Sequence, residues 1–227
     1  MPAERSLGVV IVTGSQSGLG ASVVDAVRKA GGTPVGFDRA DGADVVVDIA
    51  DTPAVDAAVR RVVADHGGID GVVTCAGTDK CGPLDRVSAD DWERVVRVNL
   101  FGTAAVVRSA LPSLKERGGR VVTVASTLGH RVFGDASAYC ASKFGVVGFT
   151  RALAAEVKGE VGVTLLTPGG MTTHFFDDRD EQYKPGPDAR LNDPDSVAAT
   201  VVFALAQPPG CEIKELVVTS SWEGSWP

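Results

Sequence analysis

The sequence lacks the cysteine and histidine patterns that hold metals or frame a disulfide-linked domain. Its four cysteines, at positions 75, 81, 140 and 211, form no CxxC pair, and its three histidines, at 66, 130 and 174, form no HExxH motif. Structural zinc sites, redox dithiols and zinc hydrolases use such spacings. We therefore expect no metal, no disulfide framework and reduced cysteines.

Long apolar runs and an excess of basic residues are missing as well. No stretch approaches the roughly 18 uninterrupted apolar residues of a membrane-spanning helix. Residues 1–5 lead almost at once into a core strand, which leaves no room for a signal peptide. The net charge of −7 disfavours nucleic acid or an anionic membrane as the main partner. We expect a cytoplasmic protein without a membrane or nucleic-acid partner.

Short apolar runs alternate with helix-like stretches along the whole chain. Strands are expected at residues 8–12, 33–37, 44–47, 71–74, 120–125, 163–166 and 215–219. Helices are expected at residues 19–30, 52–66, 137–157 and 194–206, with another that begins at Ser88. This alternation predicts a doubly wound, Rossmann-type parallel sheet of about seven strands with helices on both faces. A length of 227 residues with 44% hydrophobic residues fits one domain, residues 1–227.

A glycine-rich turn follows the first expected strand, with glycines at 14, 18 and 20 at the opening of the next helix. Glycine permits a tight turn and lets a pyrophosphate approach main-chain amides at the helix N-terminus. The spacing differs from the G-x-G-x-x-G dinucleotide fingerprint. Taken alone, the cluster therefore indicates either a phosphate-binding turn or an ordinary one.

The second expected strand leads to Asp38, in the region where such folds read the adenosine ribose. A carboxylate there can accept hydrogen bonds from both ribose hydroxyls and would repel a 2′-phosphate, which favours NAD over NADP. Arg39 acts against this preference, because a guanidinium can hold a phosphate or stack on adenine. Asp38 also fits the plain role of a turn residue before the loop at 40–42.

Tyr139 and Lys143 lie four residues apart in the helix expected at 137–157, so both side chains share one helical face. A tyrosine hydroxyl has an unperturbed pKa of about 10, and a nearby ammonium favours its ionised form. Tyr139 then becomes a usable acid or base near neutral pH. A Y-x-x-x-K pair by itself is common in ordinary helices. Ser126 supports the interpretation of Tyr139 and Lys143 as a functional pair. It follows a strand and lies at the carboxyl edge of the sheet, where open α/β sheets bind ligands.

In their order along the chain, these features resemble the short-chain dehydrogenase/reductase family over nearly the whole length. The matching features are the turn at 13–20, Asp48, Cys75-Ala76-Gly77, Asn99, Ser126, Tyr139 with Lys143, Pro168-Gly169 and Thr173. The resemblance implies an NAD(P)-dependent enzyme that interconverts a secondary alcohol and a ketone by hydride transfer on a small-molecule substrate. The alternative is a catalytically silent, dinucleotide-sensing protein on the same fold, and the intact catalytic set argues against it.

The resemblance also implies residue roles. Tyr139 would exchange a proton with the substrate oxygen, which Ser126 orients. Lys143 would hold the nicotinamide ribose and lower the Tyr139 pKa. Asn99 would support a water that links Lys143 to solvent, although taken alone it fits a solvated helix face. The cofactor would be NAD(H) in preference to NADP(H), since Ser17 is not the basic residue of many NADP-preferring relatives. Its expected contacts are Gly14, Ser15, Ser17, Gly18, Leu19, Asp38, Arg39, Asp48, Ile49, Cys75, Ala76, Gly77, Tyr139, Lys143, Pro168, Gly169, Met171 and Thr173.

Two positions depart from the family pattern. The family usually has Asn where this chain has Cys75, so an amide's polar contacts are lost while main-chain contacts to the cofactor remain. Between Asp38 and the strand at 44–47 there is only a short polar loop, where the family commonly has a helix. The adenine side of the site should therefore be relatively open.

Three segments are expected to surround the substrate: the loop after Gly77, residues 127–136 and residues 170–191. The last is long and irregular, which indicates a lid. Its aromatic residues either line a pocket or anchor the lid to the core. His130 and Arg131 either meet an anionic substrate or belong to a solvated loop.

The resemblance finally implies a homodimer or homotetramer. The long helices that carry Asn99 and Tyr139 would pair with their counterparts across a two-fold axis. The apolar residues expected at this contact are Val106, Val107, Phe144, Val147 and Phe149, unless they are buried against the protein's own sheet.

Overall fold

The computed structural model describes residues 6–226, and its centre is one parallel sheet. The strands are β1 (Val9–Thr13), β2 (Thr33–Asp38), β3 (Val45–Val46), β4 (Gly71–Thr74), β5 (Arg120–Val124), β6 (Gly162–Pro168) and β7 (Glu215–Val218). They lie in the order β3-β2-β1-β4-β5-β6-β7. Because β1 pairs with both β2 and β4, the direction of winding reverses there, and a crevice opens at the carboxyl ends of these strands. The predicted doubly wound sheet is confirmed.

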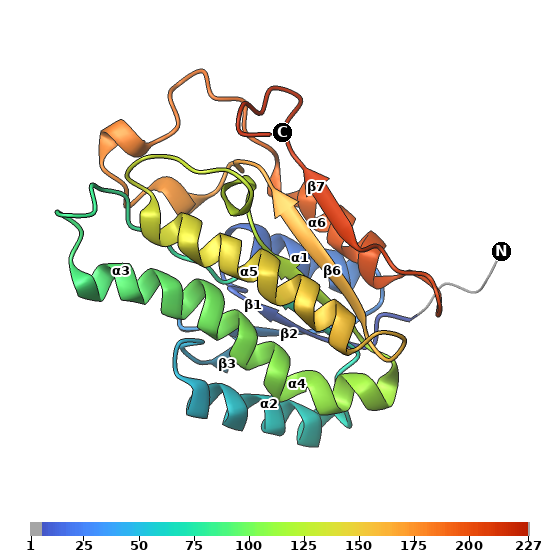
Figure 1. The fold of residues 1–227 in the computed structure, drawn as a ribbon. Helices are drawn as coiled ribbons and strands as arrows, with labels where there is room; N and C mark the ends of the chain where they lie inside the picture. Colours follow the sequence, from blue (N-terminus) through green and yellow to red (C-terminus); the bar gives the residue numbers. More distant parts are fainter. Residues whose placement is uncertain (1–5, 227) are drawn as a thin grey trace.

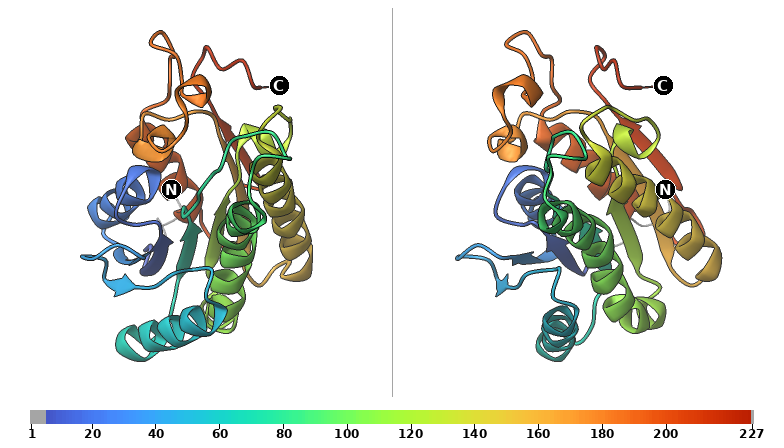
Figure 2. Two further views of the ribbon diagram at one scale, coloured as in Figure 1. Left: turned by 90° about the vertical axis from the view of Figure 1, so that its left-hand side faces the viewer. Right: turned by 60° about the vertical axis from the view of Figure 1, so that its left-hand side comes forward.

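Helices cover both faces of the sheet (Figures 1 and 2). The first face carries α1 (Gly18–Lys29) and α6 (Pro194–Leu205), and the second carries α2 (Thr52–His66), α4 (Thr103–Arg117) and α5 (Ser137–Glu156). Successive residues of β1 alternate between them: Val10 and Val12 pack in the core with α1 and α6, and Ile11 packs in the core with α2 and α4. Both cores are therefore built from continuous apolar strands, as expected for a buried parallel sheet.

The helix starts follow capping residues in the sequence. The hydroxyl of Ser88 accepts a hydrogen bond from the Asp91 N–H at the start of α3 (Ala89–Val96). The carboxylate of Asp193 accepts from the Ser196 N–H at the start of α6, and Asp51 accepts from the Ala54 N–H in α2. Side-chain caps of this kind satisfy amide groups that have no partner inside the helix.

A π-helical segment, η1 (Arg97–Gly102), joins α3 to α4, and the sequence did not predict it. A wider turn of this kind changes the direction of the side chains along the helix. It directs Asn99 into the protein, where the side chain is 1% exposed. The segment therefore decides where one of the expected catalytic residues lies.

The third strand is shorter than predicted. Asp44 does not join it, because its carboxylate accepts a hydrogen bond from the Gly36 N–H at 2.7 Å. Residues 39–44 form only turns and bends, as the short polar loop predicted.

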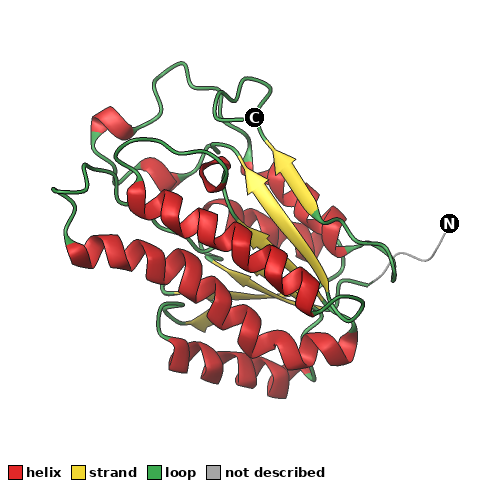
Figure 3. Ribbon diagram, viewed as in Figure 1, coloured by secondary structure: helices red, strands yellow, loops and turns green. Residues whose placement is uncertain are grey.

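Long connections gather at the end of the molecule where the strands have their carboxyl ends (Figure 3). The segment after β6 and the C-terminal tail after β7 both lie there (Figures 1 and 2). Within residues 6–226, no helix is long and apolar enough to cross a membrane. The four cysteines carry no disulfide, and the described residues hold no acidic, cysteine or histidine cluster suited to a metal ion.

Candidate active site

A cleft of about 890 Å³ opens at the carboxyl ends of the strands. Every residue that the sequence analysis assigned to cofactor or catalysis lines this cleft, except Ser15 and Asn99. Ser15 is buried beneath the glycine turn, against the main chain of Gly36. The sheet edge thus brings together residues from most of the chain, from Gly14 to Thr173.

The glycine turn has a backbone that other residues would strain. Gly14 and Gly18 have φ values of 69° and 49°. A Cβ at Gly14 would lie 2.8 Å from the Ala76 Cα, and a Cβ at Gly20 would collide with the Gly14 carbonyl oxygen. The Gly14 N–H also donates to the Phe37 carbonyl oxygen at 2.8 Å, which ties the turn to β2. These contacts hold the N-terminus of α1 at the cleft, where its amides favour an anionic group.

Two carboxylates, those of Asp38 and Asp48, line the side of the cleft next to β2 and β3. Asp38 accepts hydrogen bonds from the main-chain N–H groups of Gln16 and Ala40, both at 3.0 Å. Asp48 pairs with Arg94 of α3, at 2.7 Å between Oδ2 and Nη2. Burial acts to raise the pKa of Asp48, but the Ala50 N–H and the Arg94 guanidinium outweigh it and lower the pKa. Arg94 lines the cleft and was not predicted, because nothing in the sequence of α3 distinguishes it from other surface arginines.

These residues fit a nicotinamide dinucleotide. Gly14, Gly18 and Gly20 line the cleft at the α1 N-terminus and add no side chain there, which favours a pyrophosphate at the main-chain amides. Asp38 is held at the end of β2, where ribose hydroxyls are bound in such folds. The cleft also continues past Ser126 to the lid, which leaves room for a substrate beside the cofactor.

Ser126, Tyr139 and Lys143 meet at one end of the cleft. Ser126 follows β5, and Tyr139 and Lys143 share the inward face of the first turns of α5, where both are buried. The Lys143 Nζ donates to the Val124 carbonyl oxygen at 2.9 Å and lies 5.6 Å from the centre of the Tyr139 ring. The sheet edge and the helix spacing thus place a hydroxyl, a phenol and an ammonium together.

Burial dominates the acid–base properties of this group. It raises the pKa of Tyr139 to about 12, while hydrogen bonding with Ser126 acts in the opposite direction. Desolvation is thus the larger effect on Tyr139 here, and the expected lowering of its pKa by Lys143 stays a prediction. Burial also lowers the pKa of Lys143 to about 8, although the nearby Asp79 carboxylate acts to raise it. Burial raises the pKa of the Cys75 thiol to about 12, so Cys75 stays neutral.

Asn99 lies behind the cleft rather than on a solvated helix face. Its Nδ2 donates to the Thr78 carbonyl oxygen at 2.9 Å and to the Ser142 Oγ at 3.0 Å, and its Oδ1 accepts from the Thr78 N–H at 2.8 Å. These bonds connect the loop after β4 to α5. The expected link through water to Lys143 stays a prediction.

The segment at 170–191 lines one end of the cleft and contains two short helical turns, η3 (His174–Phe176) and η4 (Glu181–Tyr183). Phe175 and Phe176 line the cleft, and the ring centre of Phe175 lies 5.8 Å from that of Tyr139. Arg179 packs on both phenylalanine rings and pairs with Asp79. The aromatic residues therefore both line the pocket and anchor the segment, so the two alternatives hold together.

The C-terminal tail contributes a wall that the sequence analysis missed. Glu223 lines the cleft and accepts a hydrogen bond from the Gly170 N–H at 3.0 Å. His130 lies outside the cleft, where its Nε2 is 3.2 Å from the Thr167 Oγ1 and its ring packs edge-on against Trp226. Arg131 does not line the cleft either. The site therefore offers no support for an anionic substrate bound by His130 and Arg131.

Comparisons with known proteins agree with this arrangement. The sequence pattern of the short chain dehydrogenase family matches residues 8–184. D-threitol dehydrogenase of Mycolicibacterium smegmatis is 33% identical over 86% of this chain and 84% of its own length. Glycine betaine reductase ATRR of Emericella nidulans is 31% identical over 92% of this chain, which spans only 18% of that protein. An alcohol dehydrogenase from Thermococcus sibiricus, complexed with 5-hydroxy-NADP, has the same fold, with a TM-score of 0.85 at 23% identity over 95% of this chain and 97% of its own.

The fold, the glycine turn and the family match define the class of protein. The chain belongs to the short-chain dehydrogenase/reductase family. It is an NAD(P)-dependent oxidoreductase, as its named relatives are dehydrogenases and reductases.

Proposed function

We propose that this oxidoreductase interconverts a secondary alcohol and a ketone on a small molecule, with Tyr139 as the general acid and base. One observation supports this proposal above the others: Ser126, Tyr139 and Lys143 meet at the end of a cleft that fits a dinucleotide. The substrate would lie between these residues and the lid at 170–191.

The side chains then have distinct tasks. A bound nicotinamide supplies or accepts the hydride. Tyr139 donates a proton to the substrate oxygen in reduction and accepts it in oxidation. Ser126 orients that oxygen by hydrogen bonding, and Lys143 binds the ribose and adds positive charge beside the phenol. Asn99 holds the loop after β4 against α5 through Thr78 and Ser142 and thereby supports the Lys143 side of the site.

For the cofactor we propose a preference for NAD(H) over NADP(H). The Asp38 carboxylate is fixed at the cleft by two main-chain N–H groups, and a 2′-phosphate there would meet like charge. Arg39 is exposed and its charge also acts on Asp48, which weakens its attraction for a phosphate. The remaining contacts would come from the glycine turn, the residues after β4 and the segment from Pro168 to Thr173.

The test is the replacement Tyr139→Phe. Loss of general acid catalysis should lower turnover by at least about 100-fold, while the affinity for NADH, measured by fluorescence titration, changes little. The matched control is Phe203→Leu, since Phe203 is exposed on α6 and lies outside the cleft. Turnover is followed by the absorbance of the reduced cofactor with a panel of alcohols and ketones. Near-normal turnover of the Tyr139 variant would remove this residue from the mechanism.

A further inference from the structure

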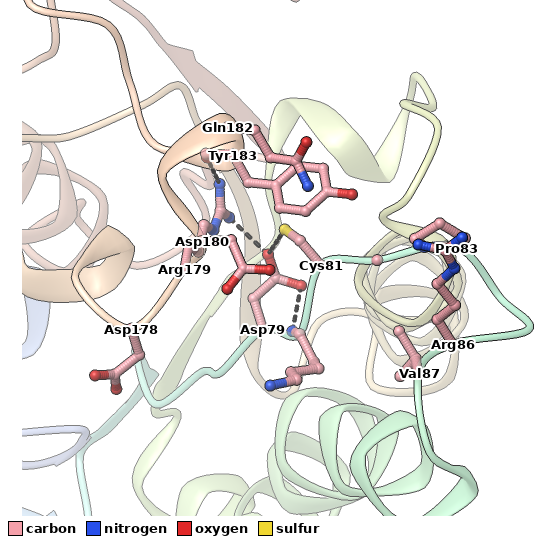
Figure 4. A pocket seen from close by; sticks show the side chains of 12 residues that line it. Asp79, Cys81, Pro83, Arg86, Val87, Asp178, Arg179, Asp180, Gln182 and Tyr183 are labelled. Atoms are coloured by element: carbon pink, nitrogen blue, oxygen red, sulfur yellow. Dashed lines mark hydrogen bonds and ion pairs between the residues drawn. The ribbon is translucent and has the colours of Figure 1, made fainter.

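An ion pair joins the lid to the loop after β4. The Arg179 Nη2 lies 2.6 Å from the Asp79 Oδ2, and the two side chains are only 18% and 3% exposed. The two residues are 100 positions apart in the chain. The same carboxylate accepts hydrogen bonds from the Lys80 N–H at 2.7 Å and from the Cys81 Sγ at 3.2 Å. Asp79 is thus held by its own loop, and Arg179 reaches it from the lid (Figure 4).

Arg179 connects this ion pair to the proposed acid. Its guanidinium lies 4.7 Å from the ring centre of Phe176 and 5.4 Å from that of Phe175. The Phe175 ring in turn packs beside the Tyr139 ring. A planar guanidinium can pair with a carboxylate and stack on an aromatic face at the same time. Asp79, Arg179, Phe175 and Tyr139 therefore form one continuous set of contacts.

A second tether fastens the lid to the loop after β5. The Tyr183 hydroxyl donates to the Asp135 Oδ2 at 2.8 Å, and the Tyr183 carbonyl oxygen accepts from Arg179 at 3.3 Å. The Gly82 N–H donates to the Asp135 carbonyl oxygen at 2.7 Å. Loops from three neighbouring strands thus meet at the ion pair.

The ion pair also separates two cavities. A smaller cavity of about 300 Å³ lies between the loop after β4 and the lid (Figure 4). It shares Asp79, Asp178, Arg179 and Tyr183 with the main cleft. The ion pair therefore lies at the border of the two spaces.

We propose that Asp79 and Arg179 act as a latch that holds the lid closed and positions Phe175 against Tyr139. They are positioning residues: neither transfers the proton, and both act through the aromatic wall of the substrate site. Breaking this buried ion pair weakens the attachment of the lid, so the lid opens more often and lets substrate in and product out. This inference rests on the proposed function, because it takes Tyr139 as the group that Phe175 positions.

Hydrogen exchange of the lid tests the latch without any substrate. Asp79→Asn and Arg179→Gln should each raise exchange of amides in residues 174–184 by at least about tenfold, with the strands unchanged. The matched control is Glu181→Gln, which breaks the exposed Lys184–Glu181 ion pair of the same lid and should leave exchange elsewhere in the lid unchanged. If the double variant exchanges no faster than Arg179→Gln alone, the two residues act as one unit. Lid exchange that stays at the parent rate in both single variants would overturn the latch.

Kinetics of the same variants test the positioning role. Breaking the latch should lower kcat/KM by about tenfold or more, with kcat and KM both affected, because the lid and the reacting group move together. Arg179→Lys keeps the positive charge but loses the planar stack on Phe175. Its lid exchange should therefore lie closer to the parent rate than its kcat does. The same variant replaces Arg179→Gln in the test if the neutral variant does not fold. Faster lid exchange with unchanged kinetics would overturn the positioning role. Failure of the proposed function is distinguishable from failure of the latch. The first would show as near-normal turnover of Tyr139→Phe, and it would not change the lid exchange of the Asp79 and Arg179 variants.

Discussion

The buried, charged side chain of Lys143 lowers the stability of the folded protein. Its ammonium is buried and has the Val124 carbonyl oxygen as a hydrogen-bond acceptor, so burial lowers its pKa from 10.5 to about 8. A change of this size corresponds to about 3 kcal/mol of preference against the charged form. Groups of this kind are retained in enzymes for their chemistry, and here the proposed role is to bind ribose and to act on Tyr139.

Replacing Lys143 by Met should therefore stabilise the cofactor-free protein. We expect the free energy of unfolding to rise by about 1–3 kcal/mol at neutral pH, reduced by the unsatisfied Val124 carbonyl, while turnover is lost. In the parent, the unfolded chain binds more protons than the folded chain between pH about 8 and 10.5, so stability from this group increases with pH across that range. The difference in free energy of unfolding between Lys143→Met and the parent should therefore become smaller as the pH rises from about 8 to 10.5. Urea denaturation at several pH values measures both effects, and a less stable variant at neutral pH would contradict the argument.

The proposed preference for NAD(H) is tested at Asp38. Asp38→Ala removes the like charge that a 2′-phosphate would meet and the acceptor for ribose hydroxyls, so the preference for NAD(H) in kcat/KM should narrow or reverse. The parent and the variant are compared with both cofactors and one substrate. Asp41→Ala, in the same exposed loop but outside the cleft, is the control. Equal or better efficiency of the parent with NADP(H) would show that Arg39 decides the pocket.

At the scale of elements, the glycine turn determines how α1 meets the sheet. α1 begins directly beneath the turn, so the first helical residues pack against the main chain of Gly14. The loop after β4 is tied to the same place, because the Ala76 N–H donates to the Thr13 Oγ1 at 3.0 Å. Small changes at the turn therefore move the helix N-terminus that faces the cofactor site.

Gly20→Ala should lower both stability and cofactor affinity. The new methyl group would collide with the Gly14 carbonyl oxygen, which is rigid main chain, and α1 would have to move away. Overpacking of this kind costs about 1–3 kcal/mol. Gly134→Ala is the control, because its Cβ would meet no atom within 4 Å. Thermal unfolding and NADH titration give the two measurements, and an unchanged melting temperature for Gly20→Ala would refute the packing argument.

For the whole molecule, two exposed aromatic rings mark a surface that a second copy could cover. Val106, Val107 and Val147 are buried in the protein's own core, which is the alternative that the sequence left open for them. Phe144 of α5 and Phe101 of η1 remain 44% and 56% exposed. Because α5 and η1 are in contact, these rings lie on neighbouring helices of the second face. We propose that this helical surface forms the interface of a homodimer or homotetramer.

Phe144→Glu should weaken that assembly. The new carboxylate would be buried between the two copies without an opposite charge to pair with, which is unfavourable. Light scattering at micromolar concentration should show a dimer or larger species for the parent and a smaller species for the variant. Val132→Glu changes a side chain that is 72% exposed on a loop, and it should leave the mass unchanged. A monomeric parent would refute the proposed oligomer.

The sequence by itself determined the succession of strands and helices along the chain and most of the catalytic and cofactor positions at the cleft, although not Arg94 or Glu223. Strand and helix periodicity is a local property, and parallel strands bring their carboxyl ends to one edge wherever the chain folds this way. Ser126 after its strand and Tyr139 one helical turn before Lys143 could therefore be assigned to one site. The capped helix starts at Ser88 and Asp193 were predictable for the same reason, since each depends on residues a few positions away.

Only the tertiary structure decided which groups are buried and which distant residues meet. The raised pKa of Tyr139 follows from desolvation by surrounding elements, which no spacing in the sequence expresses. The burial of Asn99 depends on a π-helical turn that gives no clear sequence signal. Asp79 and Arg179 meet because loops after β4 and β6 converge at the sheet edge, although each alone looks like an ordinary surface charge. Electrostatics and packing depend on distances in space, and those exist only once the chain has folded.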